Sequence, residues 1–287
     1  LPGRTIAVRA DMDGLPVTEQ TDLPFKYTVR SNYLGKDVGV SHACGHDVHT
    51  AALLGTASVL ASLRDRLPGN VVLLCQPAEE GVPAAEGIAG AERMIAEGAL
   101  ADPKVDAVFG IHAFAGLESG VLGYRHGSML AAGDRFEIVV QGRQAHGSKP
   151  WSGIDPIVAG SAIVTALQTL VSRESDLTHE PVVITVGQFE AGVRSNIIPD
   201  RARLVGTMRT FDEAMRTDLE KRMQRMVGRV AEGYGAIAKV TFEPGYPVTA
   251  NDAAFVDQLL PTLARVAPGG VREVPKITGS EDFSLFA

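Results

Sequence analysis

The sequence predicts an α/β fold, in which a mainly parallel-sheet domain carries an inserted ferredoxin-like α+β domain. Three short apolar runs, at residues 5–10, 71–75 and 105–111, are typical of strands buried on both faces of a parallel sheet. Helical segments are expected between them, at 51–63 and 90–97. Further along, the expected order becomes β-α-β-β-α-β, which indicates a ferredoxin-like sandwich with an antiparallel sheet.

Each element of the inserted domain has its own signal. Alternating apolar and polar residues predict a strand at 135–142. Asp155 and Pro156 are expected to be the N-cap and first residue of a helix, and Asp212 to cap a second helix. The remaining strands are expected at 182–189, 203–208 and 238–242.

The tail from Asn251 returns to an α/β pattern, so the middle of the chain is read as an insertion. The predicted division is 1–130 for the first part of the larger domain, 131–247 for the inserted domain, and 248–287 for an incomplete second part. A chain of 287 residues is long enough for two domains.

Composition excludes several classes of function. Hydrophobic residues make up 45% and charged residues 21%, as in an ordinary globular protein, and the net charge of -7 argues against a nucleic-acid partner. No apolar run reaches the roughly 18 residues of a membrane span. Two cysteines give no disulfide framework, so a cytoplasmic location is expected. Cys75 is expected to be a small buried hydrophobe.

Polar side chains follow each of the three predicted parallel strands. Asp11 and Asp13 follow the first strand, Glu79 and Glu80 the second, and His112 the third. In open α/β sheets, sites lie beyond the carboxyl ends of the strands. The pattern therefore predicts one shared polar site.

The run at 41–49, with sequence SHACGHDVH, precedes a predicted helix and brings a thiol close to three imidazoles. Cys44 and His46 are expected to be metal ligands, because a thiolate and an imidazole suit zinc and similar divalent metals. His42 and His49 are expected to be neighbours of the site. The alternative is that Cys44 is a nucleophile with His46 as its base.

The adjacent glutamates have side chains that diverge, so one can hold a metal while the other faces a bound water as general base. Alone, the pair Glu79 and Glu80 would read as surface acids, but their place at a strand end favours the site. Asp11 and Asp13 either fix a ligand imidazole by hydrogen bonding or cap the following turn. His112 is a predicted ligand because it is expected to lie close to Cys44, His46 and the two glutamates.

Polar loops of the inserted domain hold three further candidates: His146, Asn196 and Arg209. A histidine, an amide and a guanidinium can together bind an oxyanion and a carboxylate. Without other information, ordinary loop chemistry is the preferred reading of these residues.

Seven short motifs, in order along the chain, together resemble the M20 metallopeptidase family. They are RADMDGLP (9–16), HACGHD (42–47), QPAEEG (76–81), GIH (110–112), AHGSKP (145–150), NIIPD (196–200) and GSEDF (279–283). The branch with the greatest similarity contains amidohydrolases of N-acyl amino acids, such as hippurate hydrolases, N-acetyl amino acid deacetylases and auxin-conjugate hydrolases.

The resemblance implies a two-metal hydrolase whose inserted domain is a lid that also mediates dimerisation. Zinc or manganese is expected, with cobalt or nickel as further candidates. The implied metal ligands are Cys44, His46, Glu80 and His112. Glu79 is implied as the general base, and Asp13 as an acid that supports a ligand, while Asp11 stands where many relatives have a ligand histidine. His146 is implied to steady the oxyanion, often across the dimer, and Asn196 and Arg209 to hold the substrate.

Two departures accompany the resemblance. Relatives extend beyond both ends of this sequence and carry a further ligand histidine after the GSEDF motif, so the sequence is expected to be truncated at both ends. The segment between Glu80 and His112 is also longer than usual, with 82–89 as the extra stretch.

The predicted function is hydrolysis of the amide bond of N-acyl amino acids, or of small peptide-like amides, by a metal-bound hydroxide with Glu79 as general base. The partners expected are a small-molecule substrate and a second copy of the chain, with neither nucleic acid nor membrane. Two alternatives remain: a degenerate, non-catalytic dimeric relative, and an amidase that uses Cys44 as its nucleophile.

Overall fold

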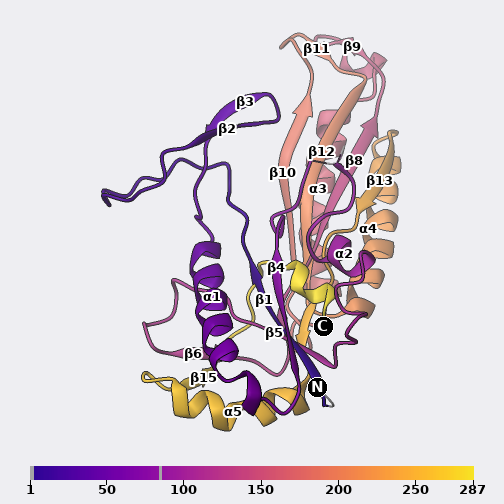
Figure 1. Cartoon of the computed structure of the whole chain (residues 1–287). Helices are drawn as coiled ribbons and strands as arrows, with labels where there is room; N and C mark the ends of the chain where they lie inside the picture. The colour runs from indigo at the N-terminus through magenta and orange to yellow at the C-terminus, as the bar shows by residue number, and fades with distance from the viewer. Residues whose placement is uncertain (1–2, 84–85) are drawn as a thin grey trace. The chain divides into compact units, whose positions relative to one another are not determined.

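The computed structural model describes residues 3–83 and 86–287, and it divides into two compact units (Figure 1). The first unit comprises Leu1–Gly123, Leu259–Arg272 and Leu285–Ala287, and the second comprises Tyr124–Gln258 and Glu273–Ser284. The predicted division at 1–130, 131–247 and 248–287 remains a prediction. In the predicted extra stretch 82–89, residues 84–85 lie outside the described part of the chain.

The first unit contains the predicted parallel sheet. Strand β1 (Thr5–Asp11) lies in the centre, between β4 (Asn70–Gln76) and β5 (Ala107–Gly110), and pairs with both in parallel. Asp11 is level with Gln76 in the β1–β4 register. The carboxyl ends of the three strands therefore share one edge, as the sequence predicts.

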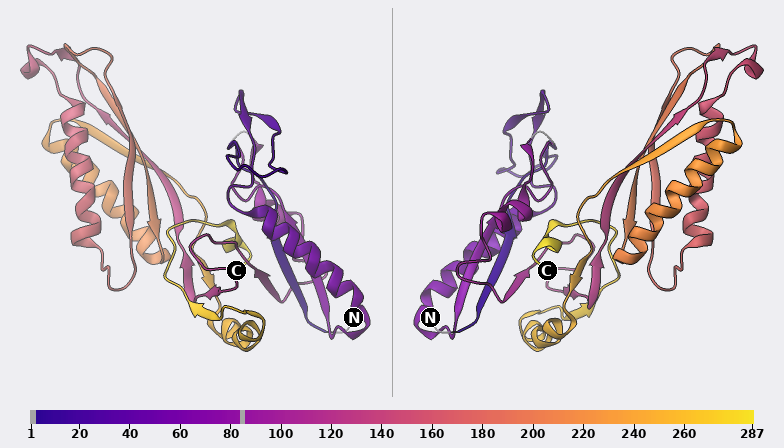
Figure 2. Two further views of the ribbon diagram at one scale, coloured as in Figure 1. Left: turned by 90° about the vertical axis from the view of Figure 1, so that its left-hand side faces the viewer. Right: turned by 90° about the vertical axis from the view of Figure 1, so that its right-hand side faces the viewer.

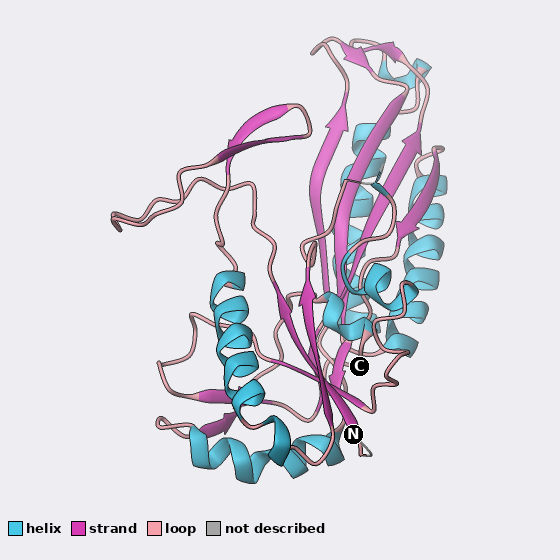
Figure 3. Cartoon of the chain, viewed as in Figure 1, coloured by secondary structure: helices cyan, strands magenta, loops and turns pink. Residues whose placement is uncertain are grey.

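Helix α1 (His46–Ser62) contacts β1 and β4. It is the upright cyan helix on the left of Figure 3. It begins about five residues earlier than expected, because Gly45 takes φ 92 at the N-cap, where a residue without Cβ is favoured. His46 is thus the first helical residue, and Cys44 belongs to the preceding loop. The remaining short elements of the unit are β2 (Arg30–Tyr33), β3 (Lys36–Gly39), α2 (Gly90–Ala96) and a 3-10 turn at Arg64–Arg66.

The prediction that Cys75 is buried is wrong, because its side chain is exposed. Strand β4 lies at an edge of the sheet. Its alternate residues Leu74 and Gln76 are only 3% and 0% exposed, whereas Leu73 is 39% exposed on the same side of the strand as Cys75. A continuous apolar run therefore marked a strand that buries one face, not two.

The second unit contains the ferredoxin-like arrangement. Its elements follow the predicted order: β8 (Ala132–Gln141), α3 (Pro156–Glu174), β10 (Val183–Ala191), β12 (Arg201–Thr210), α4 (Glu213–Gly233) and β13 (Ile237–Glu243). The strands pair antiparallel in the order β10-β12-β8-β13. Figure 2 shows α3 and α4 on one face of this sheet.

Both helix starts are capped as expected. The Asp155 carboxylate accepts hydrogen bonds from the backbone N–H groups of Ile157 and Val158, with Pro156 as the first helical residue. The Asp212 carboxylate accepts one from Met215 N–H at 2.7 Å.

The remaining described elements are β6 (Leu122–Tyr124), β7 (Gly127–Leu130), β9 (Ala145–His146), a 3-10 turn (Pro150–Ser152), β11 (Ile197–Ile198), β14 (Thr249–Asn251), α5 (Ala253–Val266), β15 (Val271–Glu273) and a 3-10 turn (Asp282–Leu285).

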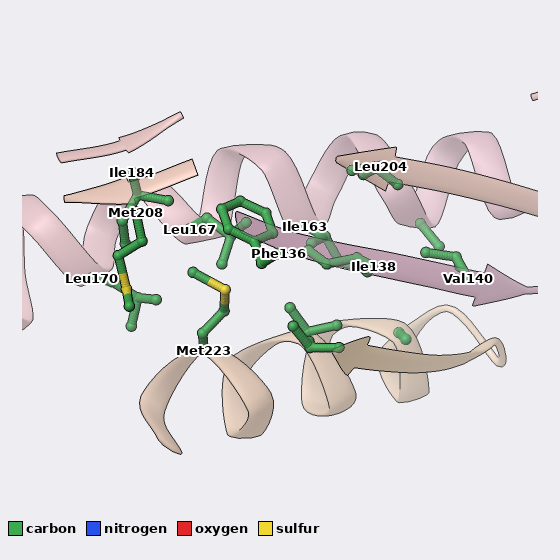
Figure 4. Close-up of a cluster of buried hydrophobic side chains, with 14 of the residues drawn as sticks. Phe136, Ile138, Val140, Ile163, Leu167, Leu170, Ile184, Leu204, Met208 and Met223 are labelled. Atoms are coloured by element: carbon green, nitrogen blue, oxygen red, sulfur yellow. The ribbon is translucent and has the colours of Figure 1, made fainter. Parts of the chain in front are cut away.

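Helix α3 is long and apolar enough to cross a membrane by length and composition, with a mean hydropathy of 1.2 over its most apolar window. Its side chains Ile163, Leu167 and Leu170 are at most 1% exposed and lie in the hydrophobic core of the second unit (Figure 4). The apolar character of α3 is therefore used in packing against the sheet.

Replacing Phe136 with Ala is expected to destabilise the second unit by about 3–5 kcal/mol, because the removed ring leaves a cavity. Phe136 is 0% exposed, and its ring lies against Gly206 of the neighbouring strand, where any Cβ would collide with it. Urea unfolding measures the change. The control Ile237→Ala, at a side chain 75% exposed, is expected to change stability by less than about 0.5 kcal/mol. Equal effects of the two variants would contradict this description of the core.

Candidate metal centre

The predicted ligand residues meet at the carboxyl edge of the parallel sheet. Ligand atoms of Cys44, His46 and His112 all lie within 4.8 Å of one another, and so do those of His46, Glu79 and Glu80. His46 belongs to both groups, so the two groups form one cluster. The cluster draws on α1 and the loop before it, on the loop after β4 and on the loop after β5.

The loop after β4 directs the side chains of Glu79 and Glu80 to different sides. Ala78 has φ 56 and Gly81 has φ 85, so the chain turns through left-handed backbone on both sides of the pair. A left-handed alanine is uncommon and is typical of functional loops that the surrounding structure holds in place. Glu79 points inward and is 5% exposed, whereas Glu80 is exposed. The adjacent side chains diverge, as their proposed roles require.

His46 presents an unpaired, buried ring nitrogen to the cluster. Its Nδ1 lies 3.1 Å from Asp13 Oδ1, so Nδ1–H donates to this carboxylate and Nε2 carries a lone pair. His46 is 1% exposed, and Nε2 has no hydrogen-bond partner within residues 3–83 and 86–287. A buried acceptor without a partner is costly, and a cation at this position would satisfy it.

His112 has the matching arrangement. Its Nδ1–H donates to the backbone oxygen of Ala113 at 2.6 Å, which leaves the Nε2 lone pair facing Cys44 Sγ at 3.6 Å. Zinc binds sulfur at about 2.3 Å and imidazole nitrogen at about 2.0–2.1 Å, so tetrahedral coordination sets two such atoms about 3.5 Å apart. The donor atoms of Cys44 and His112 therefore fit one metal ion.

Electrostatics at the cluster favour a cation and disfavour the nucleophile alternative. Burial and the carboxylates of Glu80 and Glu79 raise the pKa of the Cys44 thiol to about 12. A catalytic cysteine needs the opposite, a pKa lowered by a positive neighbour. The ring nitrogen within hydrogen-bonding distance of Sγ also belongs to His112, at 3.6 Å, rather than to His46, the base expected from the sequence.

The aspartates at the end of β1 and just after it support the histidines. Burial would lower the pKa of His46, but the hydrogen bond that its Nδ1–H donates to Asp13 and the charge of Asp11 outweigh burial and raise that pKa. Asp13 also accepts a hydrogen bond from the backbone N–H of Glu80 at 3.0 Å, so it joins two predicted ligands. The exposed imidazole of His42 lies 3.0 Å from the backbone oxygen of Asp13 and contributes no ligand to the described groups.

In the second unit, the structure brings His146 and Asn196 together. Strands β9 and β11 pair His146 with Ile197, and the backbone N–H of Gly147 donates to the Asn196 backbone oxygen at 2.8 Å. His146 Nδ1 accepts a hydrogen bond from the backbone N–H of Ser148 at 3.1 Å. The proton of a neutral His146 ring is therefore on Nε2, as an oxyanion donor requires.

Arg209 lies away from these two residues. Arg201 begins β12 close to Asn196, and Arg209 follows eight residues later near the other end of the strand. At about 3.3 Å per residue, the strand separates Arg209 from Arg201 by roughly 26 Å. Within one chain, the three candidates of the inserted domain therefore do not form one site. Arg209 instead pairs with Gly133 of β8, where a Cβ would collide with its guanidinium.

Comparison with known proteins agrees with the arrangement of these motifs. The model of peptidase family M20/M25/M40 matches residues 7–287. Thermostable carboxypeptidase 1 of Saccharolobus solfataricus is 41% identical over 99% of this chain and 68% of that protein. An N-acyl-L-amino acid amidohydrolase of Geobacillus stearothermophilus is 42% identical over 87% of this chain and 63% of that protein.

The crystal structure of a dinuclear metal-binding peptidase of the M20 family from Bacillus subtilis superposes with a TM-score of 0.80, at 37% identity over 99% of this chain and 69% of that one. The fold and the ordered motifs are those of a hydrolytic enzyme, as predicted. The chain belongs to peptidase family M20/M25/M40.

Proposed function

We propose that this protein hydrolyses the amide bond of N-acyl amino acids, or of small peptide-like amides, at a centre of two divalent metal ions. Zinc or manganese is the first choice and cobalt or nickel the second, with Cys44, His46, Glu80 and His112 as ligands. The observation that carries the proposal is the buried Nε2 of His46, which has no hydrogen-bond partner in the described part of the chain and lies among a thiol, a second imidazole and two carboxylates. The amidohydrolase and the dinuclear peptidase to which the chain is similar support it.

Bound metal ions would lower the pKa of a coordinated water and polarise the substrate carbonyl. Glu79 then acts as general base: it accepts a proton from the attacking water and passes it to the leaving amine. Its place supports this role, because Oε2 lies 3.8 Å from His46 Nε2 and the side chain is 5% exposed. Asp13 keeps the His46 proton on Nδ1, so that Nε2 remains available.

His146 is proposed to donate Nε2–H to the oxyanion, and Asn196 to hold the substrate beside it. Arg209 is proposed to bind the free carboxylate of the substrate, as a guanidinium does well. The separation of Arg209 from His146 and Asn196 within one chain supports a homodimer in which the inserted domain of one subunit completes the site of the other. The inserted domain, 131–247, is thus proposed as the lid and dimerisation domain.

Mixing inactive variants tests completion in trans. His146→Ala is expected to lower kcat by about 10²–10³-fold, because it removes one oxyanion donor. Mixing it with Glu79→Gln under conditions of subunit exchange is expected to restore roughly a quarter of wild-type activity, since half of the random dimers carry one intact site. No recovery, when size-exclusion chromatography confirms mixed dimers, would contradict action in trans.

Amino acid release from a panel of amides tests the function itself. The panel contains N-acetyl, N-benzoyl and indole-acyl amino acids, together with short peptides, each measured with chelator and then with added Mn²⁺ or Zn²⁺. We expect release that the chelator abolishes and metal restores, with the acyl preference read from the panel. No release from any member with metal added would favour a non-catalytic relative.

A further inference from the structure

We infer that His49 is a positioning residue that holds the His112 loop in place for metal binding. The inference rests on the proposed metal centre and adds a residue outside its ligand set. His49 lies one helical turn after His46, so both imidazoles leave α1 on the same face. It is 2% exposed, and each of its ring nitrogens is used in a short hydrogen bond.

Nδ1 of His49 is fixed by the strand below it. Nδ1–H donates to Asp11 Oδ1 at 2.5 Å, and the other oxygen of Asp11 accepts from Arg9 at 2.8 Å. Arg9 in turn donates from Nε to Gln76 Oε1 at 2.8 Å. Arg9, Asp11 and Gln76 are at most 5% exposed, so the carboxylate that receives His49 is held on both sides within the sheet.

Nε2 of His49 is fixed by the loop above it. The backbone N–H of Ala113 donates to Nε2 at 2.6 Å. The backbone oxygen of Ala113 accepts from Nδ1–H of His112 at 2.6 Å. Ala113 is thus held to His49 by its N–H and to His112 by its carbonyl, and the two imidazole rings contact each other with centroids 4.5 Å apart. The orientation of His112 therefore depends on His49.

The same hydrogen bonds exclude His49 as a ligand. Ligand-type atoms of Asp11, His46 and His49 lie within 4.8 Å of one another, as a metal site would have them. However, the proton on His49 Nδ1 is donated to Asp11, and the lone pair on Nε2 accepts from Ala113. Since no lone pair remains for a cation, the role left to His49 is to position its neighbour. Asp11 holds His49 in turn, because its carboxylate accepts the His49 Nδ1–H.

Cobalt binding to three variants tests this role. His49→Leu fills similar space without either hydrogen bond, and His49→Gln can supply a donor for Asp11 and an acceptor for Ala113. His49→Leu is expected to bind Co²⁺ about 10–100-fold more weakly than wild type and with an altered visible spectrum, as loss of an outer hydrogen-bond partner does. His49→Gln should recover most of the affinity. The exposed His179→Ala, in the other unit, is the control for loss of an imidazole.

Nuclear magnetic resonance of the wild type gives a test that needs no variant. A scalar coupling between the Ala113 amide nitrogen and His49 Nε2 is expected across the hydrogen bond in the metal-free protein, and its absence would overturn the inference. Wild-type affinity and spectrum in His49→Leu would also overturn it, as would a His49→Gln variant as weak as His49→Leu. A wild type that binds no Co²⁺ while showing the coupling would instead reject the proposed metal centre.

Discussion

Glu79→Gln is expected to lower kcat by about 10²–10⁴-fold while the metal content stays that of the wild type. The amide has the shape of the carboxylate but cannot take a proton from water at neutral pH. Glu79 is almost fully buried beside His46, and the neighbouring Glu80 is the residue assigned to the metal. Turnover of an N-acyl amino acid, together with elemental analysis of the same sample, measures both quantities.

The control for this change is Glu86→Gln, which removes an exposed carboxylate later in the same connection between β4 and α2. It is expected to leave kcat within about twofold, as surface substitutions away from a site do. Turnover of Glu79→Gln within a few-fold of the wild type would remove Glu79 from the role of general base. Loss of metal from the variant would instead place Glu79 among the ligands.

Cys44→Ser is expected to weaken metal binding by more than the roughly 10–100-fold that loss of an outer partner costs, because it removes a ligand. Burial and nearby carboxylates raise the pKa of this thiol to about 12, so at neutral pH it is protonated in the metal-free protein. Binding must then displace this proton, and the affinity of the wild type is expected to rise with pH over the neutral range. Calorimetry in buffers of different ionisation enthalpy measures affinity and proton release together.

Cys75→Ser is the matched control, since it makes the same change at the other cysteine of the chain, on the exposed face of β4. It is expected to leave metal affinity and proton release unchanged. The variant Cys44→Ser should release one proton fewer than the wild type. Unchanged affinity in Cys44→Ser would reject Cys44 as a ligand and leave the two imidazoles and Glu80 as the ligands.

Those parts of the fold could be predicted whose sequence signals act locally and do not depend on the rest of the structure. Asp155 and Asp212 cap helices because a carboxylate satisfies free N–H groups in any context. The hairpin of β2 and β3 was missed for the opposite reason. Its turn places Leu34 at φ 52 and Gly35 at φ 78, and leucine at the first position lacks the asparagine or aspartate that normally signals such a turn.

The site was predictable as far as topology determines it. Asp13, Glu79 and His112 could be grouped because parallel strands end at one edge of their sheet. The function of His49 could not, because it depends on the Ala113 N–H, a backbone group with no signature in sequence. The position of Ser148 beside His146 is equally local and went unnoticed. The separation of Arg209 from Asn196 within one chain depends on the length of β12, which the two motifs do not reveal.

The most direct test of the metal centre is anomalous X-ray scattering from crystals of this chain grown with Zn²⁺, with data collected on both sides of the zinc absorption edge. We predict a peak about 2.3 Å from Cys44 Sγ and about 2.0–2.1 Å from a nitrogen of His112 or His46, with a second about 3.5–4 Å from the first. Zinc bound only elsewhere on the protein, or no peak among Cys44, His46, Glu80 and His112, would contradict the assignment.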